Sequence, residues 1–178
     1  MYHIPVMLKE TIDALNKLGK KTVLLTGDNR YVANAIAEEI GVSEVVSEVL
    51  PNDKANKIKE LQANGDTVAM VGDGINDSVA LVTADVGIAV SGGTEIAIES
   101  ADVVIMNDRM SDILKAISLS KITITNIKQN LFFAFIYNVI LIPVAAFNNL
   151  NPMVAALAMS LSSVSVVTNA LRIKMKKI

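Results

Sequence analysis

Residues 67–77 read TVAMVGDGIND, and this stretch decides the fold. Its first part, Thr67–Val71, is a short apolar run with β-branched residues, as expected of a buried strand. Two glycines and two carboxylates follow it, and glycine lets the backbone pass close to a bound group without a side-chain clash. Asp73 and Asp77 are four residues apart, so a helix that begins in this loop would let both carboxylates converge on one cation. The stretch therefore predicts a strand with metal ligands beyond its carboxyl end.

Short apolar runs alternate with amphipathic helical segments along the first part of the chain. The expected strands are Thr22–Leu25, Val45–Leu50, Val86–Val90 and Asp102–Met106, and the expected helices include Val6–Leu18, Tyr31–Ile40 and Pro51–Ala63. Such alternation predicts an α/β unit in which helices wrap a parallel sheet. Ligands in this architecture gather beyond the carboxyl ends of the strands.

Two further polar groups fall at such positions. The segment Thr26–Asp28 follows the strand at 22–25, and it offers the Thr26 hydroxyl and the Gly27 N–H to a phosphoryl oxygen. Lys54, at the start of a helix, can supply positive charge to a phosphoryl group in transfer. The two carboxylates of the opening stretch suit Mg²⁺, which is often shared with substrate phosphate. Each piece alone is weak, because a Gly-Asp-Gly sequence is often only a turn, but the ordered set predicts a phosphoryl site.

Two long segments without a charge follow, Leu131–Phe147 and Met153–Leu171, with a tight turn at 148–152 between them. A helix needs roughly 20 residues to cross the hydrocarbon core, with about 17 as the lower limit. We predict two transmembrane helices; the alternative is a pair of helices buried in a soluble core, for which the preceding unit is too small. Basic residues flank the pair at one end, namely Lys121, Lys128, Arg172, Lys174, Lys176 and Lys177. The positive-inside tendency places this end, the soluble unit and both termini in the cytoplasm.

Polar residues within these segments are informative, because an unpaired polar group in lipid is costly. Tyr137 and Asn138 lie in the first segment near Pro143, and Met159 lies in the second. We interpret Tyr137, Asn138 and Met159 as part of a transport site. The serines of the second segment are interpreted mainly as helix-packing residues, which are common in membranes.

Composition excludes several classes of function. The formal net charge is −2 and no basic stripe with interleaved aromatics is present, so nucleic acid is not an expected partner. The chain has no cysteine, which excludes disulfides, thiolate metal sites and cysteine nucleophiles within it. The single histidine, His3, lies near the N-terminus and is interpreted as incidental.

Several motifs together resemble one family. TGDN, LPNDKANKIKEL, MVGDGINDSVAL and ADVGIAV are similar to the second half of the phosphorylation domain of P-type ATPases, which has the haloacid dehalogenase fold. NIKQNLFFAFIYN and MSLSSVSVVTNAL resemble the last two membrane helices of the heavy-metal (type IB) branch. The resemblance covers nearly the whole chain, and its soluble and membrane motifs agree. It implies a partial haloacid dehalogenase-like α/β domain followed by an α-helical transmembrane hairpin.

The resemblance also implies roles for matching residues in the soluble part. Lys54 would stabilise an aspartyl phosphate. The loop at 26–28 would line the same site, and Asn76 would support it. The implied phosphorylation-site residues are Thr26, Gly27, Asp28, Lys54 and Asn76, and the implied Mg²⁺ ligands are Asp73 and Asp77.

In the membrane, the resemblance is to exporters of monovalent copper. Their pattern is matched by Tyr137-Asn138 together with Met159 and Ser163, which are one helical turn apart. Zinc and cadmium exporters of the branch carry a lysine and an aspartate in these helices, and neither is present here. The soft thioether of methionine suits Cu(I), and equally another soft monovalent ion such as silver.

On this basis we expect one part of an ATP-driven Cu(I)-exporting pump of the cell membrane. The expected divisions are a partial phosphorylation domain at 1–118, a connecting helix at 119–130, two transmembrane helices within 131–172 and a basic cytoplasmic tail at 173–178. The family's nucleophile is an aspartate in a DKTGT sequence, which these residues do not contain. We therefore expect the chain to be inactive alone and to need the missing N-terminal part, which would bind most of the ATP. A membrane-anchored phosphatase of the same fold and a non-catalytic remnant are the alternatives.

Overall fold

The computed structural model describes residues 8–73, 75–90, 94–107, 109–147 and 151–175. These fall into two compact units, divided between Leu114 and Lys115. His3, Gly74, most of the turn between the two hydrophobic segments and the last three residues lie outside the described residues, and so do the expectations that concern them.

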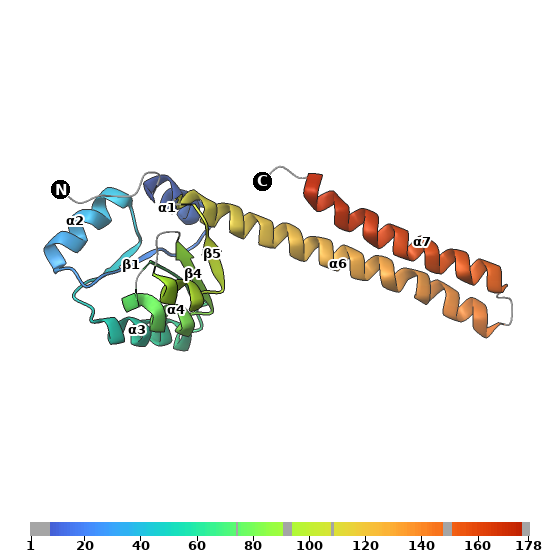
Figure 1. Ribbon diagram of the computed structural model, residues 1–178, viewed down its shortest axis with the longest axis horizontal. Coiled ribbons are helices and arrows are strands. Elements are labelled where there is room, and N and C mark those ends of the chain that lie inside the picture. Colours follow the sequence, from blue (N-terminus) through green and yellow to red (C-terminus); the bar gives the residue numbers. More distant parts are fainter. Residues whose placement is uncertain (1–7, 74, 91–93, 108, 148–150, 176–178) are drawn as a thin grey trace. The chain divides into compact units, whose positions relative to one another are not determined.

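The first unit alternates strands and helices, as predicted. Its elements are α1 (Leu8–Lys17), β1 (Val23–Leu25), α2 (Arg30–Ile40), β2 (Glu44–Val46), α3 (Pro51–Ala63), β3 (Ala69–Gly72), a 3₁₀ turn η1 (Ile75–Asp77), α4 (Ser78–Thr83), β4 (Val86–Val90), α5 (Glu95–Glu99) and β5 (Val103–Ile105) (Figure 1). All strand pairs are parallel. The strands form two sheets, ordered β1-β2 and β3-β4-β5. The predicted parallel α/β architecture is confirmed.

Local sequence accounts for the ends of several helices. Asn29 caps α2 by accepting a hydrogen bond from the Val32 N–H at 3.0 Å. Pro51 stands at the first position of α3, where its missing N–H costs nothing. Thr94 caps α5 by accepting from the Ala97 N–H. These helices cover the sheets with small and branched apolar side chains. The buried core includes Ala33, Ala37, Ile40, Ala55, Ile58, Ala80, Leu81, Ile88 and Ala89.

The prediction of a strand from Val45 to Leu50 is wrong in its length. β2 ends at Val46, and Glu48 then adopts a left-handed conformation with φ of 60°. The turn is stabilised because the Glu48 N–H donates to the Asp28 carbonyl at 2.9 Å and the Val49 N–H donates to the Thr26 carbonyl at 3.1 Å. The chain therefore leaves the sheet to pack on the Thr26 loop.

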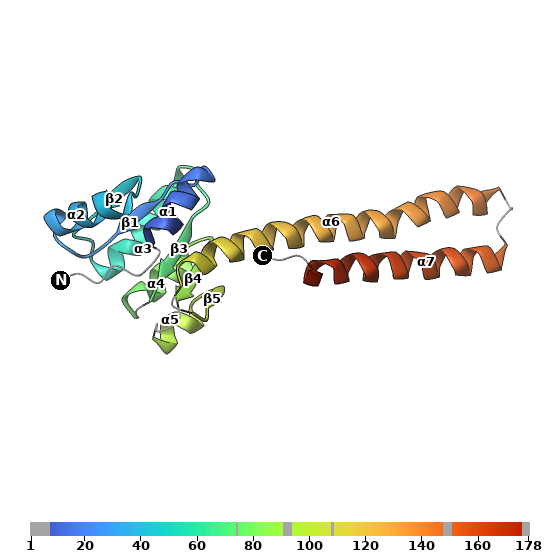
Figure 2. The ribbon, with the colours of Figure 1, turned by 90° about the horizontal axis from the view of Figure 1, so that it is seen from above.

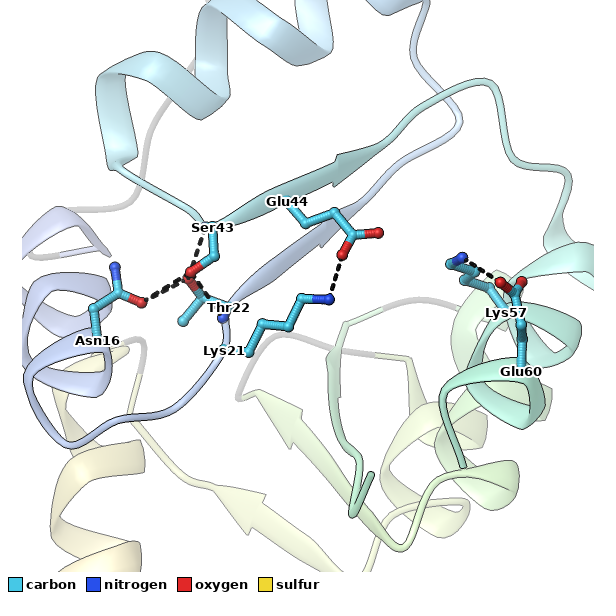
Figure 3. Close-up of polar contacts among 7 residues, drawn as sticks. All are labelled: Asn16, Lys21, Thr22, Ser43, Glu44, Lys57 and Glu60. Atoms are coloured by element: carbon cyan, nitrogen blue, oxygen red, sulfur yellow. Dashed lines mark hydrogen bonds and ion pairs between the residues drawn. The ribbon is translucent and has the colours of Figure 1, made fainter. Parts of the chain in front are cut away.

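A polar cluster joins the starting ends of β1 and β2 to α1 (Figure 3). The Thr22 hydroxyl donates to the Asn16 amide oxygen at 2.9 Å and accepts from the Ser43 N–H at 3.1 Å. Next to it, Lys21 and Glu44 form a cross-strand ion pair at 2.5 Å. Their hydrogen bond raises the pKa of Lys21 and lowers the pKa of Glu44. This end of the sheet is fixed by polar contacts, opposite to the end that carries the predicted site.

The second unit is an antiparallel pair of long helices that lie side by side in both views (Figures 1 and 2). α6 spans Ser111–Ala146 without interruption at Pro143, and α7 spans Pro152–Leu171 before a short 3₁₀ helix, η2 (Arg172–Met175). Both helices are long and apolar enough to cross a membrane, and almost none of the residues in their apolar windows is buried. The structure therefore argues against the alternative of a buried soluble core. The expected connecting helix at 119–130 is continuous with the first hydrophobic helix.

Small residues and amides hold α6 against α7. The side chains of α7 that are not exposed recur at helical spacing and include Ala155, Ala158, Ser162, Ser165, Val166 and Asn169. Asn126 and Asn169 are buried, with exposed fractions of 8% and 6%. The Asn126 amide donates to the Asn169 carbonyl at 2.8 Å, and the Asn169 amide donates to Asn130 Oδ1 at 2.9 Å. Asn130 in turn donates to Asn126 at 3.0 Å, which closes an amide ring between the two helices.

Candidate functional site: a lysine–aspartate pair at the strand ends

The predicted lysine and one predicted carboxylate meet directly. Lys54 Nζ lies 2.7 Å from Asp77 Oδ1, and the two side chains are only 15% and 12% exposed. Lys54 comes from the first turn of α3 and Asp77 from the end of η1, so the pair joins two elements that are distant in sequence. A partly buried ion pair of this geometry fixes the position of the ammonium group more firmly than a surface pair would.

Gly72 makes room for this pair. A Cβ at position 72 would lie 2.7 Å from Asp77 Cβ and 3.1 Å from Asp77 Oδ2, closer than side-chain atoms approach one another. Asp77 therefore packs directly on the backbone at the carboxyl end of β3, which only glycine allows. This close approach explains why glycine stands between the strand and the carboxylates.

The second half of the site is the loop after β1. The Thr26 hydroxyl donates to Asp28 Oδ2 at 2.9 Å and accepts from the Asp28 N–H at 3.1 Å. Gly27 is exposed, and a Cβ there would meet the Val49 carbonyl at 3.4 Å, which is ordinary contact. The loop thus presents a hydroxyl, a backbone N–H and a carboxylate in one tight turn.

The start of α3 connects both halves. The Val49 N–H bonds to the Thr26 carbonyl just before the helix, and Lys54 reaches Asp77 from its first turn. Asp73 and Asn76 follow β3 and are exposed, and the Asp73 carbonyl accepts from the Thr94 N–H at 2.9 Å. Within the described ranges no three acidic or histidine side chains group together as a metal site. The two carboxylates after β3 would need further oxygen ligands from phosphate, water or another segment to hold Mg²⁺.

The predicted membrane residues are only partly brought together. Ser163 lies one turn after Met159 and donates to its carbonyl at 3.2 Å, and Met159 is 68% exposed. Asn138 is also exposed and donates to the Ala134 carbonyl of its own helix at 3.0 Å. Tyr137 instead points toward α7, where its hydroxyl lies 3.2 Å from Ser165 Oγ. Among the residues described, no hydrogen bond joins Tyr137 or Asn138 to Met159 or Ser163.

The sequence analysis missed two features of the structure, one in each unit. It did not identify the contact of Gly72 with Asp77, although the Gly-Asp-Gly pattern marks a close backbone approach. It also did not identify the amide ring of Asn126, Asn130 and Asn169. Two asparagines four residues apart at the start of an apolar helix are a signal that could have found the ring, because residues at this spacing share a helix face.

Comparisons with known proteins give the chain a family context. Residues 4–85 match the family model of haloacid dehalogenase-like hydrolases. The copper-exporting P-type ATPase of Staphylococcus saprophyticus is 57% identical over 94% of this chain and 21% of its own length. The copper-transporting ATPase 1 of Rhizobium meliloti is 56% identical over 93% of this chain and 21% of its own length. The chain thus spans about a fifth of the length of the curated relatives it matches.

A solved structure matches both units of the chain. A zinc-transporting PIB-type ATPase in its E2.Pi state superposes with a TM-score of 0.90 and 36% identity, over 96% of this chain and 28% of that chain. The agreement extends from the parallel sheets through both hydrophobic helices, because nearly the whole chain is covered.

Proposed function

We propose that this chain, which belongs to the P-type ATPases, supplies the Mg²⁺- and phosphate-supporting half of a phosphorylation site and part of the membrane metal site of a copper-exporting pump. The observation that carries the proposal is the Lys54–Asp77 pair at 2.7 Å, held at the carboxyl end of β3 by the contact with Gly72. High identity to copper-exporting relatives along both units supports the same assignment.

Each predicted site residue of the first unit has a role in this proposal. The Thr26 hydroxyl and the Gly27 N–H contact oxygens of a phosphoryl group, and Lys54 offsets its negative charge. Asp77 orients the Lys54 ammonium, and its second oxygen together with Asp73 would hold Mg²⁺, which neutralises charge on the phosphoryl oxygens when bound. Asp28 holds the Thr26 hydroxyl within the loop, and the hydroxyl proton turns from Asp28 to a phosphoryl oxygen when the group binds. Asn76 supports the loop after β3.

The phosphorylated aspartate comes from another segment in this proposal. β1 and β3 are each the outer strand of their sheets, so within the described part of the chain each has one edge without a strand partner. A parallel strand that pairs with either edge would end beside Thr26 or Asp73, because parallel strands deliver their following residues to the same side of a sheet. An aspartate at the end of such a strand would meet the groups described above.

The transported ion is proposed to be Cu(I). The segments 131–147 and 153–171 contain no charged residue, so the lysine and aspartate expected of a zinc exporter are absent. Met159 offers a soft thioether, with Tyr137, Asn138 and Ser163 as further candidate ligands. Both helices are proposed to span the cell membrane, with the basic flanks, the soluble unit and the termini on the cytoplasmic side.

A split-pump experiment tests the phosphoryl site. The purified chain should not hydrolyse ATP alone, and it should restore Cu(I)-stimulated hydrolysis when mixed with the complementary N-terminal part of the Staphylococcus saprophyticus relative. Lys54→Met should abolish this restoration, whereas Lys59→Met, on the exposed side of the same helix, should retain it. ATP hydrolysis by the chain alone would contradict the proposal, and phosphate-ester hydrolysis that Asp73→Asn abolishes would favour the membrane-anchored phosphatase.

The metal site has its own test in the same mixture. Met159→Leu should lower Cu(I) stimulation, because it removes the thioether while keeping the side-chain volume. Met153→Leu is the matched control, since this methionine is also exposed on α7 but is not a proposed ligand. Equal effects of the two substitutions, or stimulation by Zn²⁺ instead of Cu(I), would refute the copper assignment.

A further inference from the structure

A polar pocket lies between α6 and α7 at the end of the hairpin that carries the basic flanks. Its wall includes Thr125, Asn126 and Gln129 from α6, Asn169 from α7, and Arg172 from the start of η2. Asn126 and Asn169 belong to the amide ring, so the floor of the pocket is fixed before any ligand binds. The pocket belongs to the hairpin, and none of its lining residues is a proposed phosphoryl-site residue or metal ligand.

Charge defines what this pocket can bind. All acidic residues of the chain precede Ile113, whereas seven basic residues follow it: Lys115, Lys121, Lys128, Arg172, Lys174, Lys176 and Lys177. Lys121 and Lys128 are four residues before and three residues after Thr125, so they border the same side of α6. Arg172 and Gln129 are exposed, and no side-chain partner occupies either of them among the described residues. Among the described residues of the hairpin, this pocket has donors without side-chain partners and is lined by no acidic side chain, which favours an anion.

The depth of the pocket in a membrane indicates which anion it would meet. Arg172 directly follows the last apolar residue of α7, and Asn126 lies five residues before Leu131, about 7 Å along the helix axis. The polar headgroup region extends about 5–8 Å beyond the hydrocarbon on each side of a bilayer. The pocket therefore lies at the level of lipid phosphates when the hairpin spans a membrane.

We propose that the α6/α7 pocket binds the phosphate headgroup of an anionic phospholipid. The planar Arg172 guanidinium makes paired hydrogen bonds to the phosphate oxygens, and the Gln129 amide and the second N–H of the Asn126 amide donate alongside it. Lys121 and Lys128 add attraction without direct contact. The inference rests on the membrane-spanning hairpin of the proposed function, but not on copper transport or phosphorylation.

Native mass spectrometry of the detergent-solubilised full chain tests the site. Titration with phosphatidylglycerol and with phosphatidylcholine should show one tightly retained phosphatidylglycerol per chain. Arg172→Gln should weaken its retention at least about tenfold, because a charge-assisted bidentate contact is lost. Lys174→Gln removes the same charge two residues away, outside the pocket lining, and should weaken retention at most about fivefold. Gln129→Met, an exposed position, should give an intermediate loss.

Three outcomes would overturn the proposal. Equal effects of Arg172→Gln and Lys174→Gln would show a general electrostatic attraction without a site. Displacement of the lipid by millimolar inorganic phosphate would identify free phosphate as the ligand. Retention that does not distinguish phosphatidylglycerol from phosphatidylcholine would show that no anion is selected. Co-flotation of the chain with phosphatidylcholine vesicles after a carbonate wash separates these failures from a failure of membrane insertion itself.

Discussion

Substitution of Gly72 by alanine tests whether backbone contact positions the Lys54–Asp77 pair. The new Cβ would lie 2.7 Å from Asp77 Cβ, so Asp77 must move by about 0.7 Å or more to reach ordinary van der Waals contact. Overpacking of this kind costs about 1–3 kcal/mol, and the lower entropy of the unfolded chain returns about 0.4–1 kcal/mol. We expect the free energy needed to open β3 locally to fall by about 1–2 kcal/mol.

Hydrogen exchange of the full chain in detergent measures this loss directly. The amides of Ala69–Gly72 should exchange about 5–30 times faster in Gly72→Ala. Gly27→Ala is the control, because its Cβ meets the Val49 carbonyl at 3.4 Å and should change exchange little. In a Lys54→Met background the cost of Gly72→Ala should shrink, since Asp77 is then free to move. Unchanged exchange at β3, or a cost that is the same in both backgrounds, would refute the steric reasoning.

Substitutions at Lys54, Asp77 and Asp85 probe charged groups of the soluble unit. In a denaturant titration, Lys54→Met should destabilise the unit by about 3 kcal/mol, because it leaves the nearly buried Asp77 carboxylate without its partner. Adding Asp77→Leu should recover most of this lost stability. Hydrogen bonds from the Val68 N–H and the Gln62 amide lower the pKa of the Asp85 carboxyl. The ionised Asp85 therefore stabilises the fold at neutral pH, and this stabilisation is lost as the pH falls through the lowered pKa. Asp85→Asn should therefore flatten the acid limb of stability against pH, and an unchanged slope would contradict this.

Elements whose bounds follow from local chemistry were predictable from the sequence. α3 spans Pro51–Ala63 and β4 spans Val86–Val90, as expected from a proline at the first helical position and from an apolar run of strand length. The end of β2 was not predictable in this way. Glu48 turns away because its N–H and the N–H of Val49 donate to carbonyls in the loop after β1, which lie 20 and 23 residues earlier in the chain. Tertiary hydrogen bonds outweighed the β propensity of the valine that follows.

The closeness of Lys54 to a carboxylate after β3 was predictable from the sequence, but the identity of that carboxylate was not. Lys54 and Asp77 are 23 residues apart, and their placement near strand ends indicates a shared site without saying which carboxylate the lysine binds. Gly72 allows Asp77 to pack closely on the end of β3, and Lys54 bonds to the Asp77 carboxylate there. Side-chain pairs of this kind depend on the exact approach of two elements, which periodicity and motif spacing do not specify.

The exposed polar residues of the hairpin matter for the proposed membrane span, because there they would face lipid or another helix. Met159 and Asn138 are exposed, and polar groups in lipid are costly unless they are hydrogen-bonded. Asn138 and Ser163 each donate to a carbonyl four residues earlier in their own helix, which leaves the Asn138 oxygen without a hydrogen-bond partner among the described residues. A metal that recruits the Asn138 or Ser163 oxygen need not break these bonds, because only the N–H and O–H groups are used in them. In the proposed function, these two side chains can therefore keep a hydrogen bond within their own helix and still offer an oxygen to an ion.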